Sequence, residues 1–386
     1  MSTPRATRGA GASRTAAGIR IAIRADASIS IGSGHIMRCL ALADGLRAEG
    51  AEPQFITRAH DGNLDALIEA RGYRVHSLRG DVGVTRSEHV ASGEPPHAVL
   101  LGCDWHRDLA DTARVLESIG GVDWLVIDHY ALDARWHEPV RKFADRLFVI
   151  DDLADRDHDA DLLLDQNLVE HSQQRYHSRT GPGCERLLGA RYALLRPEFA
   201  ALRKRAKLHV IEGKPRLLVF FGGVDATDET GKFLDAWSGN EAARFVADVV
   251  IGARHPRRSL HEQCRRPGVT VHGYVPAMAE LMAGADYAFG ASGTSNWERF
   301  CLGVNAAVVS IAHNQTAIAR YLGEQGWFDS LGDARDTTPE TYRRALLTLD
   351  PASPAALARR ERLMQAVDGL GVQRVVRRML GKPEAL

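Results

Sequence analysis

The chain has 386 residues, with 49 basic and 49 acidic side chains and an apolar fraction of 45%. This balance argues against a basic surface for nucleic acid, and no apolar run reaches the roughly 18 residues of a membrane span. The length is enough for two domains of ordinary size.

The cysteine pattern bears on redox environment and on metal binding. Five cysteines are scattered without a C-x-x-C pair: Cys39, Cys103, Cys184, Cys264 and Cys301. This argues against a disulfide framework and a thiolate zinc site, and it predicts a reducing cytoplasmic location. Residues 1–18 are mostly Ala, Gly, Thr, Ser and Arg without an apolar core. We expect a disordered tail there, and no signal peptide.

A glycine-bearing turn joins the first predicted strand, residues 19–23, to a predicted helix at residues 37–47. The turn contains Gly32, Gly34 and His35. Unpaired N–H groups at a helix start favour an anion, and His35 is the one side chain of the turn that titrates near neutrality. This arrangement suggests chemistry on a phosphorylated substrate. The alternative is a capping or packing histidine, since the turn lacks the third glycine of the dinucleotide motif.

Strands and helices alternate through the rest of the first half. Strands are predicted at residues 52–57, 73–78, 124–127, 147–150 and 162–164, and helices at 62–72, 108–119 and 133–145. Residues 81–96 are polar with Gly and Pro, which predicts a loop. The alternation predicts a doubly wound α/β sheet, whose ligands bind beyond the carboxyl ends of its strands.

A second α/β unit follows an Arg- and Lys-rich passage at residues 196–214. Its strands are predicted at residues 216–221, 245–251, 269–272, 287–290 and 307–311. We therefore expect an N-terminal Rossmann-like domain (19–200), a linker (201–214) and a C-terminal Rossmann-like domain (215–386), facing each other across a cleft. The helical tail near 355–380 should pack across both domains.

Two polar runs follow strand ends in the first half. Asp128, His129 and Tyr130 close one strand, and there a histidine and a phenol could position a sugar or share a proton. The alternative is that Asp128 caps the next helix and Tyr130 packs. The acidic run at 151–161 lacks a convincing ligand spacing, so it predicts a solvated loop and no metal site.

Two glycines follow the first predicted strand of the second half, in a turn that could hold a diphosphate. Gly222 and Gly223 would let the diphosphate lie against backbone amides. The alternative is a tight turn with Asp225 or Thr227 as a helix N-cap.

The run from Gly290 to Glu298 follows a strand and opens a helix. Small residues such as Gly293 and Thr294 leave room for a phosphate, and Glu298 could accept two hydrogen bonds from a ribose diol. A capping box of Ser295 with Glu298 is the competing interpretation.

Asn314 and Gln315 are uncharged amides that follow another strand. Such groups suit sugar hydroxyls or acetamido groups. The alternative is a helix cap before Thr316.

Six motifs occur along the chain in one order: Arg24-Ala25-Asp26, Gly32-Ser33-Gly34-His35-Ile36-Met37-Arg38, Ile127-Asp128-His129-Tyr130, Gly222-Gly223-Val224-Asp225, Trp297-Glu298-Arg299 and Asn314-Gln315. Together they resemble the UDP-2,4-diacetamido-2,4,6-trideoxy-β-L-altropyranose hydrolases of pseudaminic acid biosynthesis, over residues 19–380. The resemblance implies a GT-B-like fold with His35 as catalytic residue. It also implies that Tyr130 and Asn314 line the sugar site and that Glu298 contacts the ribose of UDP.

The resemblance implies hydrolysis at the anomeric carbon, with His35 as general base, UDP as leaving group and inversion at that carbon. Neither a metal nor another cofactor is needed. The expected partner is the UDP-linked diacetamido trideoxy sugar, and we expect a monomer. Two alternatives stay open: a GT-B glycosyltransferase that uses a UDP-amino sugar, and a non-catalytic nucleotide-sugar binding protein.

Overall fold

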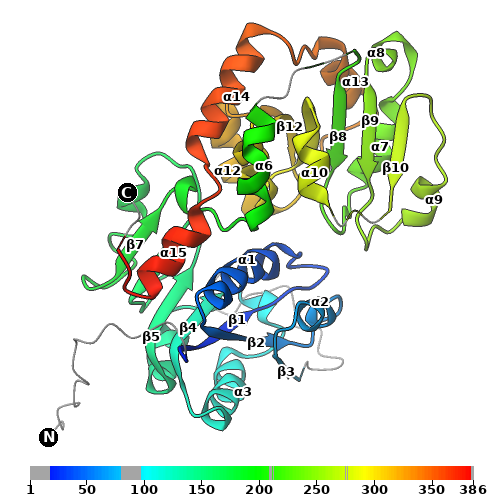
Figure 1. Cartoon of the computed structure of the whole chain (residues 1–386). Coiled ribbons are helices and arrows are strands. Elements are labelled where there is room, and N and C mark those ends of the chain that lie inside the picture. Colours follow the sequence, from blue (N-terminus) through cyan, green and yellow to red (C-terminus); the bar gives the residue numbers. More distant parts are fainter. Residues whose placement is uncertain are drawn as a thin grey trace, which may run out of the picture.

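The computed structural model describes residues 18–79, 97–207, 211, 213–273, 275 and 277–383. They form two α/β domains, one built mainly from the first half of the chain and one mainly from the second (Figure 1). The predicted tail at 1–18, except for its last residue, and the predicted loop at 81–96 lie outside the described residues.

The first domain contains a sheet of seven parallel strands in the order β3-β2-β1-β4-β5-β6-β7. Their bounds are β1 Arg20–Ala25, β2 Glu52–Arg58, β3 Val75–Leu78, β4 Val122–Asp128, β5 Ala144–Ile150, β6 Leu162–Asp165 and β7 Glu185–Leu188. The strand order reverses between β1 and β4, and crevices for ligands form at such a reversal. Both the first glycine turn and Asp128 therefore lie where a ligand site is expected.

Helices cover both faces of this sheet. They are α1 Gly34–Ala48, α2 Asp65–Ala70, α3 Trp105–Ser118, α4 Ala134–Val140 and the short α5 Ser172–Arg175, with 3₁₀ turns η1 Ala98–Leu101, η2 Arg141–Phe143 and η3 Ala190–Tyr192. Helix α1 packs Leu42 and Leu46 into one core, and Trp136 of α4 packs into the core on the other face. Because α1 begins at Gly34, three residues earlier than predicted, His35 belongs to its first turn.

The second domain contains six parallel strands in the order β10-β9-β8-β11-β12-β13. Their bounds are β8 Arg216–Phe220, β9 Val246–Val250, β10 Val269–His272, β11 Tyr287–Ala291, β12 Asn305–Ser310 and β13 Asp329–Asp333. The apolar pattern does not predict the edge strand β13, because Leu331 is the one apolar residue in it. The glycine turns after β8 and β11 lie at the reversal point of this sheet.

The helices that follow in sequence are α6 Pro197–Lys207, α7 Glu229–Ala236, α8 Gly239–Ala243, α9 Arg258–Glu262, α10 Met278–Ala283, α11 Ser295–Leu302, α12 His313–Glu324, α13 Pro339–Thr348, α14 Pro354–Ala366 and α15 Gly371–Met379. No helix in the described part of the chain is long and apolar enough to cross a bilayer.

The segment predicted as a passage between the domains is largely helical. Helix α6 lies within it, and its Phe199 is buried against the second domain in one core with Trp297 and Phe300. An Arg- and Lys-rich composition suggests a solvated linker, but the few apolar side chains of this helix are enough to bind it to α10 and α11.

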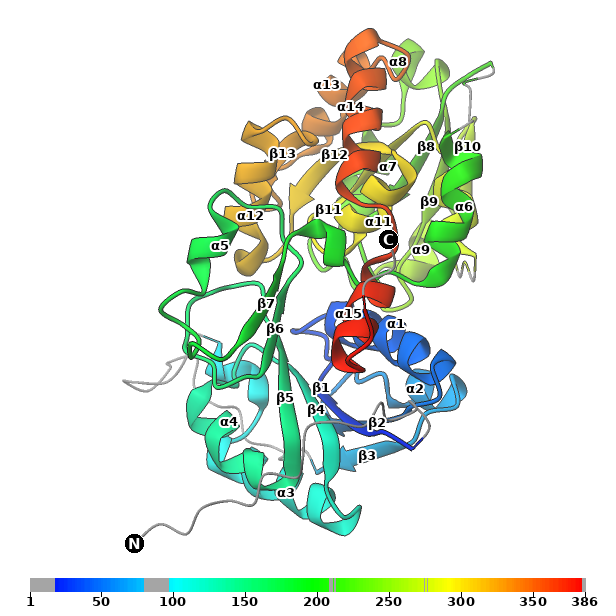
Figure 2. The same ribbon diagram turned by 60° about the vertical axis from the view of Figure 1, so that its left-hand side comes forward.

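The C-terminal tail consists of two helices, and each packs on a different domain. Helix α14 packs on the second domain through Leu363, and α15 packs beside α1 of the first domain (Figure 2). Val375 of α15 belongs to the same buried core as Leu42. Gly45 of α1 permits this approach, since a Cβ there would lie 2.4 Å from Cγ1 of Val372.

Candidate functional site

The candidate site begins with a hydrogen-bonded histidine–aspartate pair at the carboxyl ends of β1 and β4. His35 Nδ1 lies 2.5 Å from Oδ1 of Asp128, and both side chains are buried. An ionised carboxylate accepts hydrogen bonds and donates none, so the shared hydrogen belongs to Nδ1. In a neutral imidazole Nε2 then carries a lone pair and can accept a proton.

Arg38 fixes the Asp128 carboxylate from the same helix face as His35. Its Nε donates to Oδ2 at 2.7 Å and an Nη donates to Oδ1 at 2.6 Å, while the other Nη reaches Asp152 at 2.8 Å. Burial alone would raise the pKa of Asp128, but the Arg38 guanidinium and His35 hold it well below its usual range. Asp128 therefore stays ionised. The alternative in which it caps the next helix is wrong, because the N-cap of α4 is Asp133, whose Oδ1 accepts from the Arg135 N–H at 3.0 Å.

Tyr130 contacts the His35 ring, as expected for two residues of one site. The ring centroids are 4.5 Å apart and the planes are nearly perpendicular, at 79°. Burial, with the Asp152 carboxylate as the next cause, raises the pKa of the Tyr130 phenol well above its usual value. The phenol therefore stays protonated and is able to donate a hydrogen bond.

His129 lies between Asp128 and Tyr130 in the sequence, and its side chain holds the backbone and Asp26 in place. Its Nδ1 accepts from the Ala131 N–H at 3.0 Å, so its hydrogen lies on Nε2, which faces Oδ2 of Asp26 at 3.4 Å. Burial lowers the pKa of His129 to about 3, so the ring is neutral near pH 7. Asp26 is also buried and pairs with Arg24 at 2.5 Å.

The domains meet where three of the predicted site residues face each other. A Cβ on Gly34 would lie 3.8 Å from Cγ2 of Thr294, and one on Gly223 would lie 3.9 Å from Oγ of Ser33. The glycine turn after β1 thus faces the loops after β8 and β11. Arg254 also spans the junction, with one Nη donating to the Asn63 carbonyl at 2.6 Å.

In the loop after β8, Gly222 has a backbone conformation that favours glycine, and Asp225 binds backbone N–H groups of helix α7. Gly222 has a φ of 101°, which disfavours other residues. Asp225 accepts from the N–H groups of Glu229 and Thr230, both at 2.9 Å. The N-cap of α7 is nevertheless Asp228, whose Oδ1 accepts from the Gly231 N–H at 3.0 Å, so the alternative with Asp225 or Thr227 as the N-cap is wrong. The diphosphate role of Gly223 stays a prediction.

In the loop after β11, helix α11 begins at Ser295 with Thr294 at the N-cap position and without a side-chain cap. The alternative of a capping box between Ser295 and Glu298 is therefore wrong. Burial raises the pKa of Glu298, and Arg196, whose Nη2 lies 3.8 Å away, opposes that rise. Glu298 lies in the first turn of α11, and its contact with a ribose stays a prediction.

Gln315 lies beside this loop. Its Oε1 accepts from the Ile311 N–H at 3.3 Å, and a Cβ on Gly293 would lie 3.6 Å from its Nε2. Gln315 therefore joins Gly293 and Thr294 on one side of the junction. Asn314 lies on α12, but its side chain is outside the described residues, so its predicted role stays open.

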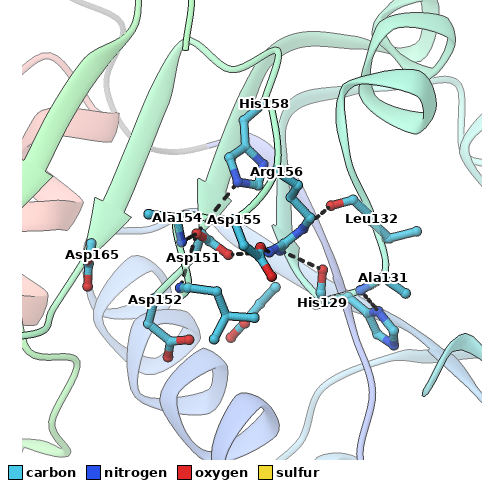
Figure 3. Close-up of polar contacts among 12 residues, drawn as sticks. His129, Ala131, Leu132, Asp151, Asp152, Ala154, Asp155, Arg156, His158 and Asp165 are labelled. Atoms are coloured by element: carbon cyan, nitrogen blue, oxygen red, sulfur yellow. Dashed lines mark hydrogen bonds and ion pairs between the residues drawn. The ribbon is translucent and has the colours of Figure 1, made fainter. Parts of the chain in front are cut away.

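The acidic run at 151–161 is not the solvated loop that its composition predicts. Asp151 directly follows β5, is buried, and accepts from the Tyr176 hydroxyl at 2.8 Å. Arg156 pairs with it at 2.8 Å (Figure 3). The error arises because arginines pair with these acids: Arg156 with Asp151 and Asp155, and Arg141 with Asp159 and Asp161. The count of acids along the sequence does not reveal these partners.

One group of possible metal ligands occurs among the described residues: Asp228, His255 and His261. His255 Nδ1 accepts from the Arg257 N–H at 3.0 Å, so its Nε2 carries the hydrogen and faces Asp228 at 3.3 Å. His261 Nε2 lies 2.7 Å from the same carboxylate. A protonated Nε2 has no lone pair for a metal, so these contacts fit a hydrogen-bond network better than a metal site.

Sequence reasoning missed the partners of His35. It offers Asp128 a capping role as an alternative and assigns neither Arg38 nor Asp152 to the site. The signal was lost because the helix was predicted to begin at residue 37; since α1 begins at Gly34, Arg38 lies three residues after His35 on the same helix and shares its face. Asp128 and Asp152 both follow buried strands of the same sheet.

No family model matches the chain. It is similar to the spore coat polysaccharide biosynthesis protein SpsG of Bacillus subtilis, with 29% identity over 196 residues, 48% of this chain and 56% of that protein. The chain spans 55% and 56% of the length of two curated relatives that it matches.

Among solved structures, MurG of Acinetobacter baumannii matches with a TM-score of 0.62 and 14% identity, over 94% of this chain and 99% of that one. UGT89C1 of Arabidopsis thaliana, solved with UDP-L-rhamnose, matches with a TM-score of 0.59 and 12% identity, over 94% and 99%. At these identities the likeness concerns the fold alone. The chain has the fold of the GT-B glycosyltransferases, so the predicted fold class is confirmed, while the hydrolase resemblance stays a prediction.

Proposed function

We propose that this chain breaks the anomeric C–O bond of a UDP-sugar and passes the sugar to a hydroxyl acceptor, with His35 as general base. The observation that carries the proposal is the 2.5 Å contact of His35 with Asp128 at the domain junction. The relation to SpsG and the UDP-sugar in a solved protein of the same fold support the substrate class.

The His35–Asp128 pair suits this role for electrostatic reasons. Asp128 holds the hydrogen on Nδ1, which leaves Nε2 free to take a proton from the attacking hydroxyl. The imidazolium that forms then lies beside an ionised carboxylate. Proton transfer of this kind accelerates a reaction by roughly 10²–10⁴-fold.

The second domain would hold the leaving group. The diphosphate gains negative charge as the bond breaks, and backbone N–H groups near Gly223 and at the start of α11 would stabilise it. Glu298 would accept hydrogen bonds from the ribose. Direct attack from the opposite face of the sugar inverts the anomeric carbon.

Hydrolysis is the second candidate, and the burial of His35 favours it. His35 is 5% exposed and packs against Tyr130. Such a buried base is easier to reach for water than for a large acceptor. The order of the six motifs, which resembles that of the altropyranose hydrolases, favours the same outcome. The chemistry of His35 would be unchanged, with water in place of the hydroxyl.

The deciding experiment is NMR of the full chain with UDP-2,4-diacetamido-2,4,6-trideoxy-β-L-altropyranose in ¹⁸O-water, with and without a panel of methyl glycosides as acceptors. Sugar transfer that requires an acceptor supports the proposal. Free sugar with ¹⁸O at C1 in the absence of acceptor establishes hydrolysis instead. Label in UDP would mean attack at phosphorus and would overturn the role of His35. If this UDP-sugar binds but does not turn over with or without an acceptor, the result supports the alternative of a non-catalytic binding protein.

The matched variants are His35→Ala and His106→Ala. His106 is an exposed histidine of the same domain that also pairs with an aspartate, Asp104. We expect His35→Ala to abolish turnover and retain UDP binding, and His106→Ala to change neither. Loss of UDP binding together with turnover in His35→Ala would indicate a structural His35.

A further inference from the structure

The turn that carries Tyr130 is held by a buried arginine from another segment. The turn follows β4, and the Leu132 N–H donates to the His129 carbonyl at 3.2 Å to close it. The His129 side chain also accepts from the Ala131 N–H. Tyr130 lies inside this turn, so the orientation of the turn sets the direction of its ring.

Arg156 donates to both ends of this turn. Its Nε donates to the Leu132 carbonyl at 3.0 Å and an Nη donates to the His129 carbonyl at 3.3 Å (Figure 3). These two carbonyls flank Tyr130 in the sequence. A planar guanidinium that binds both of them fixes the peptide plane directly before Tyr130 and the one after Leu132, and so holds the turn at both ends.

Arg156 is itself anchored on the neighbouring strand. Its second Nη pairs with Asp151 at the end of β5 at 2.8 Å and with Asp155 at 2.9 Å. Burial would lower the pKa of Arg156, but Asp151 and Asp155 raise it, so the cation persists. The side chain is 5% exposed and therefore has little freedom to move. Arg156 thus ties the turn after β4 to the end of β5.

We propose that Arg156 is a positioning residue, which sets the Tyr130 ring against His35 and so defines the space in which a nucleophile reaches His35. This inference deepens the proposed function and rests on it for the role of His35. The competing interpretation is that Arg156 neutralises Asp151 and has no effect on the site beyond stability.

The variants are Arg156→Lys, Tyr130→Ala and their combination, with Arg141→Lys as control. A lysine keeps the charge but cannot bind two carbonyls and a carboxylate in one plane. Arg141 makes a comparable bidentate pair with Asp159 and also binds Asp161, but it has no contact with the turn among the described residues.

We expect Arg156→Lys to lower kcat by between about tenfold and 10²-fold, as small misplacements in active sites do, with the Kd for UDP unchanged. In the Tyr130→Ala background the same change should cost less than about twofold, because coupled residues are not additive. Arg141→Lys should leave kcat unchanged. An equal loss in both backgrounds would overturn the proposal, as would an equal loss from Arg141→Lys.

A readout that does not need turnover separates this inference from the proposed function. With ¹³C-labelled histidine, the Cε1–H resonance of His35, assigned by its loss in His35→Ala, reports the ring current of Tyr130. Arg156→Lys should move it in the same direction as Tyr130→Ala, and Arg141→Lys should not. If the resonance moves in this way but the wild-type protein turns over no substrate, the proposed function is refuted and the positioning role is supported. An unmoved resonance in Arg156→Lys would overturn the positioning role.

A second variant covers the case in which Arg156→Lys fails to fold. Asp151→Asn combined with Arg156→Gln removes both charges together, so no buried ion is left without a partner. It should move the His35 resonance as Arg156→Lys does. If the double variant melts normally and leaves that resonance in place, the positioning role is refuted.

Discussion

His35 and Asp128 form one hydrogen-bonded pair although 93 positions separate them in the sequence. The register of the sheet explains this, because Ala25 of β1 lies opposite Asp128 of β4 in the parallel ladder. The chain then passes through the glycine turn into α1, whose first turn places His35 against Asp128 at the end of β4. The pair therefore depends on the reversal of strand order between β1 and β4, where two turns diverge and leave room for a ligand.

The first prediction concerns the charge of Asp128, the carboxylate that accepts the Nδ1 hydrogen of His35. Asp128→Asn keeps the shape of the side chain but removes its charge, so the imidazolium formed during catalysis loses its stabilising partner. We expect kcat to fall by about 10²–10⁴-fold, with the Kd for UDP within about twofold. Steady-state kinetics and calorimetry measure the two quantities. Asp123→Asn, in the same strand but at its other end, is the control and should leave kcat unchanged. A normal kcat in Asp128→Asn would exclude His35 as a base that depends on this carboxylate.

The strand ends could be predicted from the sequence better than the contacts between them. Apolar runs such as 124–127 and 147–150 predict buried parallel strands, and both lie within strands of the structure. The edge strands β7 and β13 were missed because short or polar edge segments lack that apolar run. The glycine turn after β8 was also located correctly, since Gly222 closely follows the apolar strand that ends at Phe220 and has a φ of 101°.

The partners of the site residues depend on which strands are neighbours, and a single sequence does not contain that information. Asp128 and Asp151 are similar acids at similar strand ends, yet one binds His35 and the other binds Arg156. Arg38 could be placed on a helix that follows His35, but its target could not be identified. Tertiary order therefore decided between capping, packing and site roles for these residues.

The second prediction tests the close approach of the two domains at Gly34. A valine there would place two methyl groups toward Thr294, whose Cγ2 lies 3.8 Å from the position of a Cβ. We expect Gly34→Val to raise the KM for the UDP-sugar by about tenfold, because filled space at a junction excludes ligand. Gly181→Ala, where nothing lies within 4 Å of a Cβ, is the control. An unchanged KM with an unchanged melting temperature would place the ligand elsewhere.

The third prediction concerns Glu298 and the ribose. Glu298→Gln removes the charge that would accept two hydroxyl hydrogen bonds, and we expect UDP to bind weaker by about 1.5–3 kcal/mol. The loss should disappear with 2′,3′-dideoxy-UDP, which lacks the two donors. Titration calorimetry with both nucleotides gives the comparison, with Glu324→Gln at the other end of the next helix as control. An equal loss for both nucleotides would mean that Glu298 acts through Arg196 or through the fold.

The fourth prediction concerns the stability of the first domain in acid. His129 is neutral when folded, with its pKa lowered to about 3 by burial, and it regains an ordinary pKa of about 6.5 when unfolded. Its contribution is therefore complete above pH 6.5 and is lost as the pH falls from 6.5 toward 3, because the unfolded chain binds the extra proton. Between pH 6.5 and pH 5 this amounts to about 2 kcal/mol.

The measurement is urea unfolding at pH 7.5, 6 and 5, followed by hydrogen exchange of peptides from β4 so that the first domain is observed by itself. His129→Asn removes the titrating group, and we expect it to flatten the pH dependence of the unfolding free energy by one proton. His171→Gln, which removes an exposed histidine of the same domain, should leave that dependence as it is in the wild type. If both variants lose stability toward acid as steeply as the wild type, His129 is charged in the folded chain, and the hydrogen-bond assignment that places its proton on Nε2 is wrong.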